Sequence, residues 1–203
     1  MLQIVKNQND FYTSVEKALD EIDPKWKTYN GVVIVGSHKP ENINQKIEII
    51  RMCREQNIPI LCICMGHQLM AIEFAKNVLG ISDANSEELE PTLTNSVVVK
   101  MPQLRVGIFP VIYEPQKPPE YESYWHNYKI NDNFAQLFTR HFDIIVSTSA
   151  QFGNILDYMK LKDHPHFVGV QSHPEYQSSK EKPHKVLVAF INACKANKTM
   201  YAV

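Results

Sequence analysis

Apolar residues follow two different spacings along the first half of the chain. Residues 11–22 (FYTSVEKALDEI) and 42–56 (NINQKIEIIRMCREQ) carry apolar side chains three and four positions apart, which is typical of an amphipathic helix. Residues 31–35 (GVVIV) and 58–64 (IPILCIC) are short continuous apolar runs, which are typical of buried strands. Because strands that alternate with helices favour a parallel sheet covered by helices, we predict an α/β sandwich of three layers with a mostly parallel central sheet.

The second half of the chain has a different pattern. Four segments favour strands of a more antiparallel kind: 95–100, 104–113, 124–131 and 143–152. Residues 114–123, which are polar and rich in proline, indicate an exposed loop. A last strand is predicted in 166–176 and a terminal helix in 183–196. We therefore expect a small antiparallel sheet in addition to the central one.

Composition narrows the class of protein. A chain of 203 residues with 44% hydrophobic residues has enough apolar mass for one full core, so we expect a single domain over residues 1–203. The formal net charge of −1 gives no basic field that would attract nucleic acid. The N-terminus shows no basic lead into an apolar stretch, and no apolar run has the length of a membrane helix. We expect a cytoplasmic protein that binds neither nucleic acid nor a membrane.

Cys64 stands at an unusual place in this pattern. It ends the apolar run 58–64, and a helix is predicted in residues 68–80, so the thiol lies on a strand-to-helix turn. Such a turn exposes a side chain, and the helix N-terminus with its backbone N–H groups favours a thiolate. Gly66 suits the turn because a Cβ there would crowd the substrate or the backbone. Cys64 is therefore a candidate nucleophile, and the alternative is a small core residue.

The cysteines as a group indicate free thiols. All four lack the spacing of a secreted disulfide framework: Cys53, Cys62, Cys64 and Cys194. Cys62 and Cys64 have no second pair of Cys or His at the spacing that would complete the four ligands of a zinc ion. We expect no metal and no cofactor.

His173 is the candidate that would protonate a leaving amine, because imidazole titrates closest to neutral pH. Pro174 restricts the backbone after it, and the Glu175 carboxylate would accept a hydrogen bond from the ring and fix its tautomer. Cys64 and His173 both lie at the carboxyl ends of predicted strands, and parallel sheets bind ligands beyond those ends. We expect three other histidines to be ordinary surface residues: His38, His141 and His184.

These motifs carry a resemblance to a known family. Residues 64–68 (CMGHQ) resemble the C-x-G-x-Q elbow of class I glutamine amidotransferases, and residues 169–176 (GVQSHPEY) resemble their His-x-Glu segment. Three further stretches are similar to the C-terminal glutaminase domain of CTP synthase: 12–19, 71–89 and 163–176. The similarity covers nearly the whole chain and implies the flavodoxin-like fold of that class, here as a free-standing domain.

The resemblance also implies a reaction. Cys64 would attack the side-chain amide of glutamine, His173 would transfer the proton that lets ammonia leave, and Glu175 would orient His173. Water would then hydrolyse the glutamyl thioester. Seven residues are implied to bind the substrate or its oxyanion: Gly36, Ser37, Met65, Gln68, Glu88, His126 and Asn127. Glu88 would take the ammonium group of the substrate.

The sequence departs from the family in the two parts that bind substrate. The oxyanion loop Pro-Gly-Gly-Phe-Gly is Val-Gly-Ser-His-Lys in residues 35–39, so only Gly36 is retained. Three residues stand where the family carries arginines: Ser123, Trp125 and Asn127. His126 or a neighbour would have to replace the lost charge in part. Trp125 is read either as a recognition residue or as a packed strand aromatic.

Two further departures concern whole elements. Residues 20–30 (DEIDPKWKTYN) are too short for the additional strand that the family has there, so we expect one edge strand to be missing. We also expect no counterpart of the amidoligase domain of CTP synthase, because residues 1–203 contain no phosphate-binding glycine loop.

Three functions remain open at this point. The first is a glutaminase subunit that passes ammonia to a separate amidoligase or synthetase. The second is a hydrolase of another γ-glutamyl amide, which the altered carboxylate-binding stretch favours. The third is a regulatory or binding homologue of low activity, which the altered oxyanion loop favours. The retained Cys64, His173 and Glu175 favour the first of these.

Overall fold

The computed structural model describes residues 1–93 and 96–200, and its centre is a six-stranded sheet. In spatial order the strands are β1 (Gln3–Val5), β2 (Val32–Ile34), β3 (Ile60–Ile63), β8 (Phe167–Val170), β7 (Gly153–Leu161) and β6 (Phe142–Ser149). The first four strands are parallel, and β7 and β6 continue the sheet in antiparallel pairing. The mostly parallel central sheet predicted from the sequence is thus confirmed.

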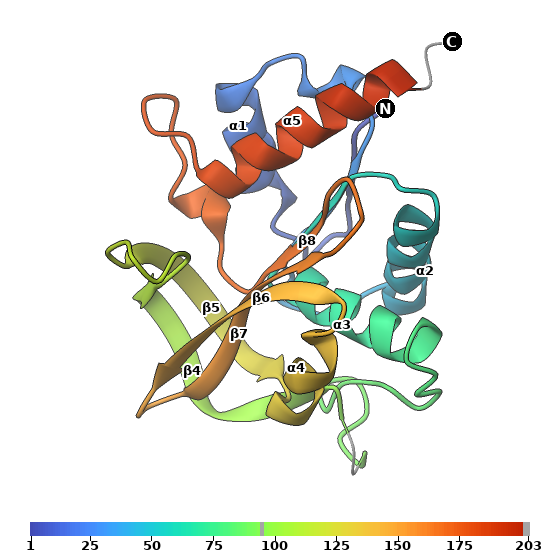
Figure 1. The fold of residues 1–203 in the computed structure, drawn as a ribbon, viewed down its shortest axis with the longest axis vertical. Helices are drawn as coiled ribbons and strands as arrows, with labels where there is room; N and C mark the ends of the chain where they lie inside the picture. The colour runs from blue at the N-terminus through green and yellow to red at the C-terminus, as the bar shows by residue number, and fades with distance from the viewer. Residues whose placement is uncertain (94–95, 201–203) are drawn as a thin grey trace.

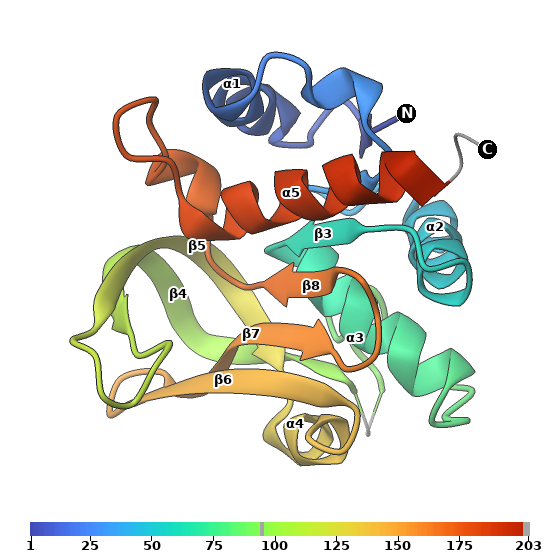
Figure 2. The same ribbon diagram turned by 45° about the horizontal axis from the view of Figure 1, so that its top comes forward.

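Helices cover both faces of the sheet and make the three layers (Figures 1 and 2). On one face lie α1 (Tyr12–Ile22) and α5 (Lys185–Met200), and on the other lie α2 (Ile43–Glu55) and α3 (Met65–Asn77). Alternate strand residues serve the two cores. Leu61 packs in the α1–α5 core and Cys62 in the α2–α3 core, because successive side chains of a strand point to opposite faces. Continuous apolar runs are therefore required in these central strands.

The second sheet is a two-stranded antiparallel ribbon of β4 (Val98–Val111) and β5 (Glu120–Ile130), which curves beside the main sheet (Figure 1). The small antiparallel sheet expected from the sequence is thus present. It differs in extent, because the separately predicted strands 95–100 and 104–113 form one strand with a register shift between Lys100 and Arg105. Residue 95 lies outside the described residues. The predicted loop is also shorter, since β5 already begins at Glu120.

Two strands and one α-helix were not predicted: β1, β7 and α4 (Asp132–Phe138). The strand predicted in 143–152 is β6, but it pairs with β7 in the main sheet instead of joining the ribbon. Residues 23–31 contain the 3-10 helix η1 (Trp26–Thr28) and no strand, so the missing strand is confirmed and β1 lies at the sheet edge. Within the described ranges, none of the helices has the length and apolarity needed to span a bilayer.

Candidate active site

Cys64 lies on a sharp turn between β3 and α3. Its backbone φ of 53° and ψ of −107° are unusual for a residue other than glycine, and strained conformations of this kind cluster at functional sites. The Cys64 N–H donates to the Val170 carbonyl at 2.8 Å, which ties the turn to β8. Because α3 begins at the next residue, Cys64 is the N-cap residue of that helix and lies at its positive end.

Gly66 allows α3 to start this close to the sheet. A Cβ at this position would lie 2.4 Å from the Ile34 carbonyl oxygen, which is far below a normal contact distance. The sequence predicted that a Cβ here would crowd either the substrate or the backbone, and the structure shows that it would crowd the backbone of β2. The helix predicted in 68–80 consequently begins earlier, at Met65, directly after the nucleophile.

His173 and Glu175 form a buried pair after β8, at the 3-10 helix η2 (Pro174–Tyr176). The His173 Nδ1 atom lies 2.7 Å from Glu175 Oε1, so Nδ1–H donates to the carboxylate and Nε2 is left to face the site. The His173 N–H also donates to the Ser123 carbonyl at 2.8 Å, which anchors the loop to β5. Among the described residues, Nε2 has no hydrogen-bond partner.

Cys64 and His173 come together around Gly36, in the loop after β2. A Cβ on Gly36 would lie 2.9 Å from His173 Cε1 and 3.3 Å from Cys64 Cβ, so the two loops leave no room for a side chain. Burial disfavours the charged imidazole, but the Cys64 thiolate and the Glu175 carboxylate outweigh it and hold the pKa of His173 well above its ordinary value. The surroundings of His173 therefore favour a protonated imidazole beside Cys64.

A second set of contacts reaches Cys64 through two glutamines. Gln68 donates from Nε2 to the Tyr128 carbonyl at 2.9 Å and to Gln171 Oε1 at 3.1 Å. Gln171 in turn places its Nε2 3.7 Å from Cys64 Sγ, within donating distance of a thiolate. Sγ also lies 3.7 Å from the Trp125 carbonyl. Sequence reasoning assigned no role to Gln171, although it lies in the segment 169–176 that resembles the family, directly after β8.

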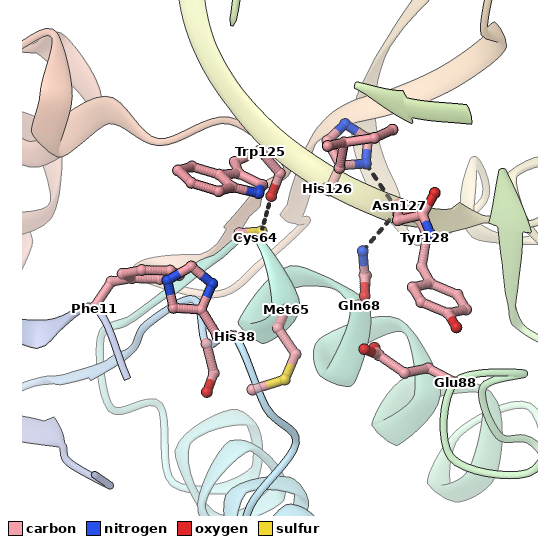
Figure 3. Close-up of a pocket in the computed structure, with 12 residues that line it drawn as sticks. Phe11, His38, Cys64, Met65, Gln68, Glu88, Trp125, His126, Asn127 and Tyr128 are labelled. Carbon is pink, nitrogen blue, oxygen red and sulfur yellow. Dashed lines mark hydrogen bonds between the residues drawn. The ribbon is translucent and has the colours of Figure 1, made fainter. Parts of the chain in front are cut away.

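A small cavity of about 150 Å³ opens beside Cys64 (Figure 3). Of the residues predicted to bind substrate, six line it: Ser37, Met65, Gln68, Glu88, His126 and Asn127. Gly36 lies behind Cys64 and His173 instead of in the wall. The volume is below the roughly 300–1,000 Å³ of sites for drug-sized ligands, which suits a substrate as small as an amino acid.

Glu88 supplies the negative charge of this cavity. Burial raises the pKa of its carboxyl group above the ordinary value. No hydrogen-bond partner of the carboxylate occurs within residues 1–93 and 96–200, although the Glu88 N–H donates to Ser86 Oγ at 3.1 Å. A bound ammonium group would restore the favourable environment of the ionised carboxylate.

His126 lines the cavity as a neutral ring. It is 5% exposed, and its Nδ1–H donates to the Tyr128 carbonyl at 2.8 Å. Burial, with a smaller contribution from the nearby Arg105 charge, lowers the pKa of His126 to about 3. The ring therefore does not provide the positive charge that was expected to replace an arginine.

The altered oxyanion loop is held by the N-terminal segment. Phe11 N–H donates to the Gly36 carbonyl at 2.9 Å, and His38 N–H donates to the Asn9 carbonyl at 3.3 Å. Ser37 is not among the residues with positive φ, so its side chain causes no backbone strain. Nothing in the sequence pattern indicated that residues 7–11 would contact this loop.

Aromatic rings form the other side of the cavity. His38 is exposed, as expected for a surface residue, but its ring also packs edge-on against Phe11 and Trp125, with ring centroids 4.2 and 5.5 Å apart. Trp125 is 53% exposed at the rim, so it is not a buried packing residue. Figure 3 shows these three rings on one side of Cys64 and Glu88 on the other.

Comparisons with known proteins identify the family. A family model described as glutamine amidotransferase class-I matches residues 2–193. The CTP synthase of Thermomicrobium roseum is 34% identical over 192 residues, which cover 86% of this chain and 35% of that protein. The CTP synthase of Thermotoga maritima is 36% identical over 210 residues, which cover 92% of this chain and 38% of that protein. The chain belongs to the class-I glutamine amidotransferase family.

Within this family, the chain is similar to the glutaminase domain of CTP synthase, as its sequence suggested. The Trypanosoma brucei CTP synthase glutaminase domain with bound acivicin superposes with a TM-score of 0.79 and 21% identity, covering 95% of this chain and 92% of that one. A putative GMP synthase subunit from Thermoplasma acidophilum superposes with a TM-score of 0.62 and 18% identity, covering 98% of this chain and 96% of that one. At these identities the likeness shows the fold. The chain spans little more than a third of the length of the CTP synthases it matches.

Proposed function

We propose that this domain hydrolyses the side-chain amide of glutamine through a covalent thioester on Cys64. The observation that carries the proposal is the strained turn that places Cys64 beside the buried His173–Glu175 pair. The Cys64 thiolate would attack the amide carbon, and the C–N bond would break as His173 donates its proton to the departing ammonia. Water, deprotonated by His173, would then cleave the C–S bond and release the acid and free Cys64.

Backbone N–H groups would stabilise the oxyanion formed in each step. Met65 occupies the first position of α3, where an N–H has no partner within the helix. The second donor would come from the loop at Gly36 and Ser37, which contacts Cys64 closely. Each such donor contributes about 3–4 kcal/mol to transition-state stabilisation in known enzymes.

The ammonia would serve a separate synthetase. Glutamine amidotransferase domains pass ammonia to a synthetase partner, and the relatives matched here are CTP synthases. We therefore propose an amidoligase subunit as the partner. Ammonia production that rises when candidate synthetases and their substrates are added would support this assignment, and an unchanged rate with every candidate would count against it.

The hydrolysis itself is tested with purified protein. Incubation with glutamine should release ammonia and glutamate, and Cys64→Ser should abolish this release. A γ-glutamyl peptide is incubated separately, and its hydrolysis would be detected as glutamate and the freed amino acid or peptide, without ammonia. Cys62→Ser is the matched control, because Cys62 lies two residues earlier on the same turn-forming segment and is fully buried in the core. Release from the γ-glutamyl peptide alone would favour the second function. No release from either compound would contradict the proposal.

A further inference from the structure

The cavity beside Cys64 has a one-sided charge. The described residues that line it include one carboxylate, Glu88, and no Lys or Arg. A free amino acid carries both an ammonium and a carboxylate group, and burying a carboxylate without a cation or several donors is costly. The pocket is therefore suited to a substrate with a positive charge and no negative one.

The basic residues of the two ribbon strands, β4 and β5, do not supply the missing positive charge. Arg105 is buried and pairs with Asp157, with 3.2 Å between Nη1 and Oδ1. Lys129 donates to Asp132 at 3.1 Å and to the Asn154 carbonyl at 2.8 Å. The third, Lys100, is exposed and is not part of the cavity wall. Arg105 and Lys129 are thus both paired with other groups of the protein.

His38 and His126 are the two histidines that line the cavity, and neither is suited to bind the α-carboxylate of a free amino acid. Burial lowers the pKa of His126 to about 3, so that it is neutral at physiological pH. His38 lies on the aromatic side with Phe11 and Trp125, whereas Glu88 lies on the opposite side of Cys64 (Figure 3). A substrate with its amide at Cys64 and its ammonium at Glu88 would keep its α-carbon away from His38.

The wall near Glu88 is polar but uncharged. Asn127 lines it, and its side-chain amide offers both a donor and an acceptor, which complements a peptide group better than a carboxylate. Leu104, which is 47% exposed, lies beside it at the rim, because Leu104 and Asn127 flank the paired residues Arg105 and His126. A group attached to the α-carbonyl would leave the cavity over apolar surface.

We propose that the preferred substrate is glutamine whose α-carboxyl group is in an amide linkage, either the α-amide of glutamine or the N-terminal glutamine of a peptide. This inference rests on the proposed cysteine-dependent hydrolysis and specifies its substrate. The bond from the side-chain carbonyl to nitrogen is cleaved as in free glutamine, through the same thioester on Cys64. The free α-ammonium group binds Glu88, and the α-amide binds Asn127.

Steady-state kinetics with three compounds test the proposal: glutamine, L-glutaminamide and the dipeptide glutaminyl-leucine. We expect kcat/KM for both amides to exceed that for glutamine about tenfold or more, since a charged group left without its partner costs at least that much. Chromatography must show isoglutamine and glutamyl-leucine as products, which separates side-chain hydrolysis from α-amide cleavage and from spontaneous cyclisation. A kcat/KM for glutamine equal to or above those of both amides overturns the proposal, and a gain for one amide alone identifies the source of the substrate.

Substitutions at the wall provide an independent test. Asn127→Arg adds the missing cation and should shift the kcat/KM ratio of glutamine to glutaminamide towards glutamine about tenfold, whereas Asn127→Gln, the matched control, should leave it nearer to the wild-type ratio. An unchanged ratio in Asn127→Arg overturns the proposal. If no compound is hydrolysed and Cys64 resists a glutamine-like electrophile, the proposed function itself has failed, which is a different result from a preference for glutamine.

Discussion

At the scale of single residues, the chemistry depends on how His173 is held. Glu175 accepts a hydrogen bond from His173 Nδ1 at 2.7 Å, so the other ring nitrogen, Nε2, remains available to Cys64. The negative charges of Cys64 and Glu175 raise the pKa of His173 against the effect of burial. A protonated ring is the form that can donate to departing ammonia.

Replacing Glu175 by Gln tests this arrangement. Glutamine keeps the size of the side chain but removes a charge that raises the His173 pKa. We expect kcat for ammonia release to fall about 100-fold or more while KM changes much less, because general acid–base catalysis contributes on that order. Steady-state kinetics measure both constants, and the exposed Glu181→Gln is the control. A wild-type kcat in Glu175→Gln would refute the orienting role.

The residues of this site differed in how far the sequence could predict them. Cys64, His173 and Glu175 belong to short local motifs, and the structure brings all three together as the motifs indicated. Gln171, although it lies within the segment 169–176, and Phe11 were assigned no role, and both reach the site because β8 and the N-terminal segment end beside it. Proximity of this kind depends on the packing of distant segments, which residue spacing does not encode.

At the scale of elements, the loop after β2 depends on a buried ion pair. Lys46 Nζ of α2 lies 3.0 Å from Asp10 Oδ1, and both side chains are inaccessible to solvent. Asp10 also forms a β-bridge with Ser37. The pair therefore fixes the N-terminal segment that holds the oxyanion loop to the main fold.

Removing one member of the pair should destabilise the protein. We expect Lys46→Met to lower the free energy of unfolding by about 3–5 kcal/mol, because it leaves the Asp10 carboxylate buried without its partner. Asp10→Asn combined with Lys46→Met should recover part of this loss, since no charge is then left unpaired. Urea denaturation measures both variants. A double variant no more stable than Lys46→Met would contradict this account of the pair.

Element prediction succeeded where the apolar spacing was long or continuous. Helices α1 and α2 and strands β2 and β3 lie within the segments whose periodicity predicted them. β1 has only three residues and α4 only seven, too few to show a period. The signal for β7 was weak as well, because three consecutive buried residues interrupt its alternation.

At the scale of the whole molecule, burial of neutral imidazoles links stability to pH. Burial lowers the pKa of His67 to about 4, and that of His126 and His166 to about 3. In the unfolded chain these groups bind protons below the ordinary pKa of about 6.5. The unfolded state therefore holds more protons as the pH falls from that value towards 4, and the folded state loses stability in this window.

The His67→Gln variant tests this linkage. Each neutral histidine should add about 1.4 kcal/mol per pH unit to the slope of the free energy of unfolding against pH in this window. The slope of the variant should therefore be smaller than that of the wild type by about this amount. Urea denaturation across the acid range gives the slope, and the half-buried His141→Gln is the control. The same slope in His67→Gln and wild type would show that His67 is not held neutral in the folded protein.

The cavity is also a property of the whole molecule. Its wall combines the N-terminal segment, the loop after β2, the Cys64 turn with the start of α3, the segment before β4, and both ribbon strands. The sequence predicted most of the residues that line it through resemblance to a family, but not their charge balance. That balance depends on burial and on which cations already have partners, as His126 and Arg105 illustrate.

Site-specific labelling tests the central claim, that Cys64 is a nucleophile activated by His173. The protein is incubated with a glutamine-like electrophile such as acivicin, digested, and mapped by mass spectrometry. We predict one adduct, on Cys64, that forms much more slowly in His173→Ala, with Cys53, Cys62 and Cys194 unmodified because all three are fully buried. An adduct on another cysteine, or hydrolysis of glutamine compounds that persists in Cys64→Ser, would contradict the account.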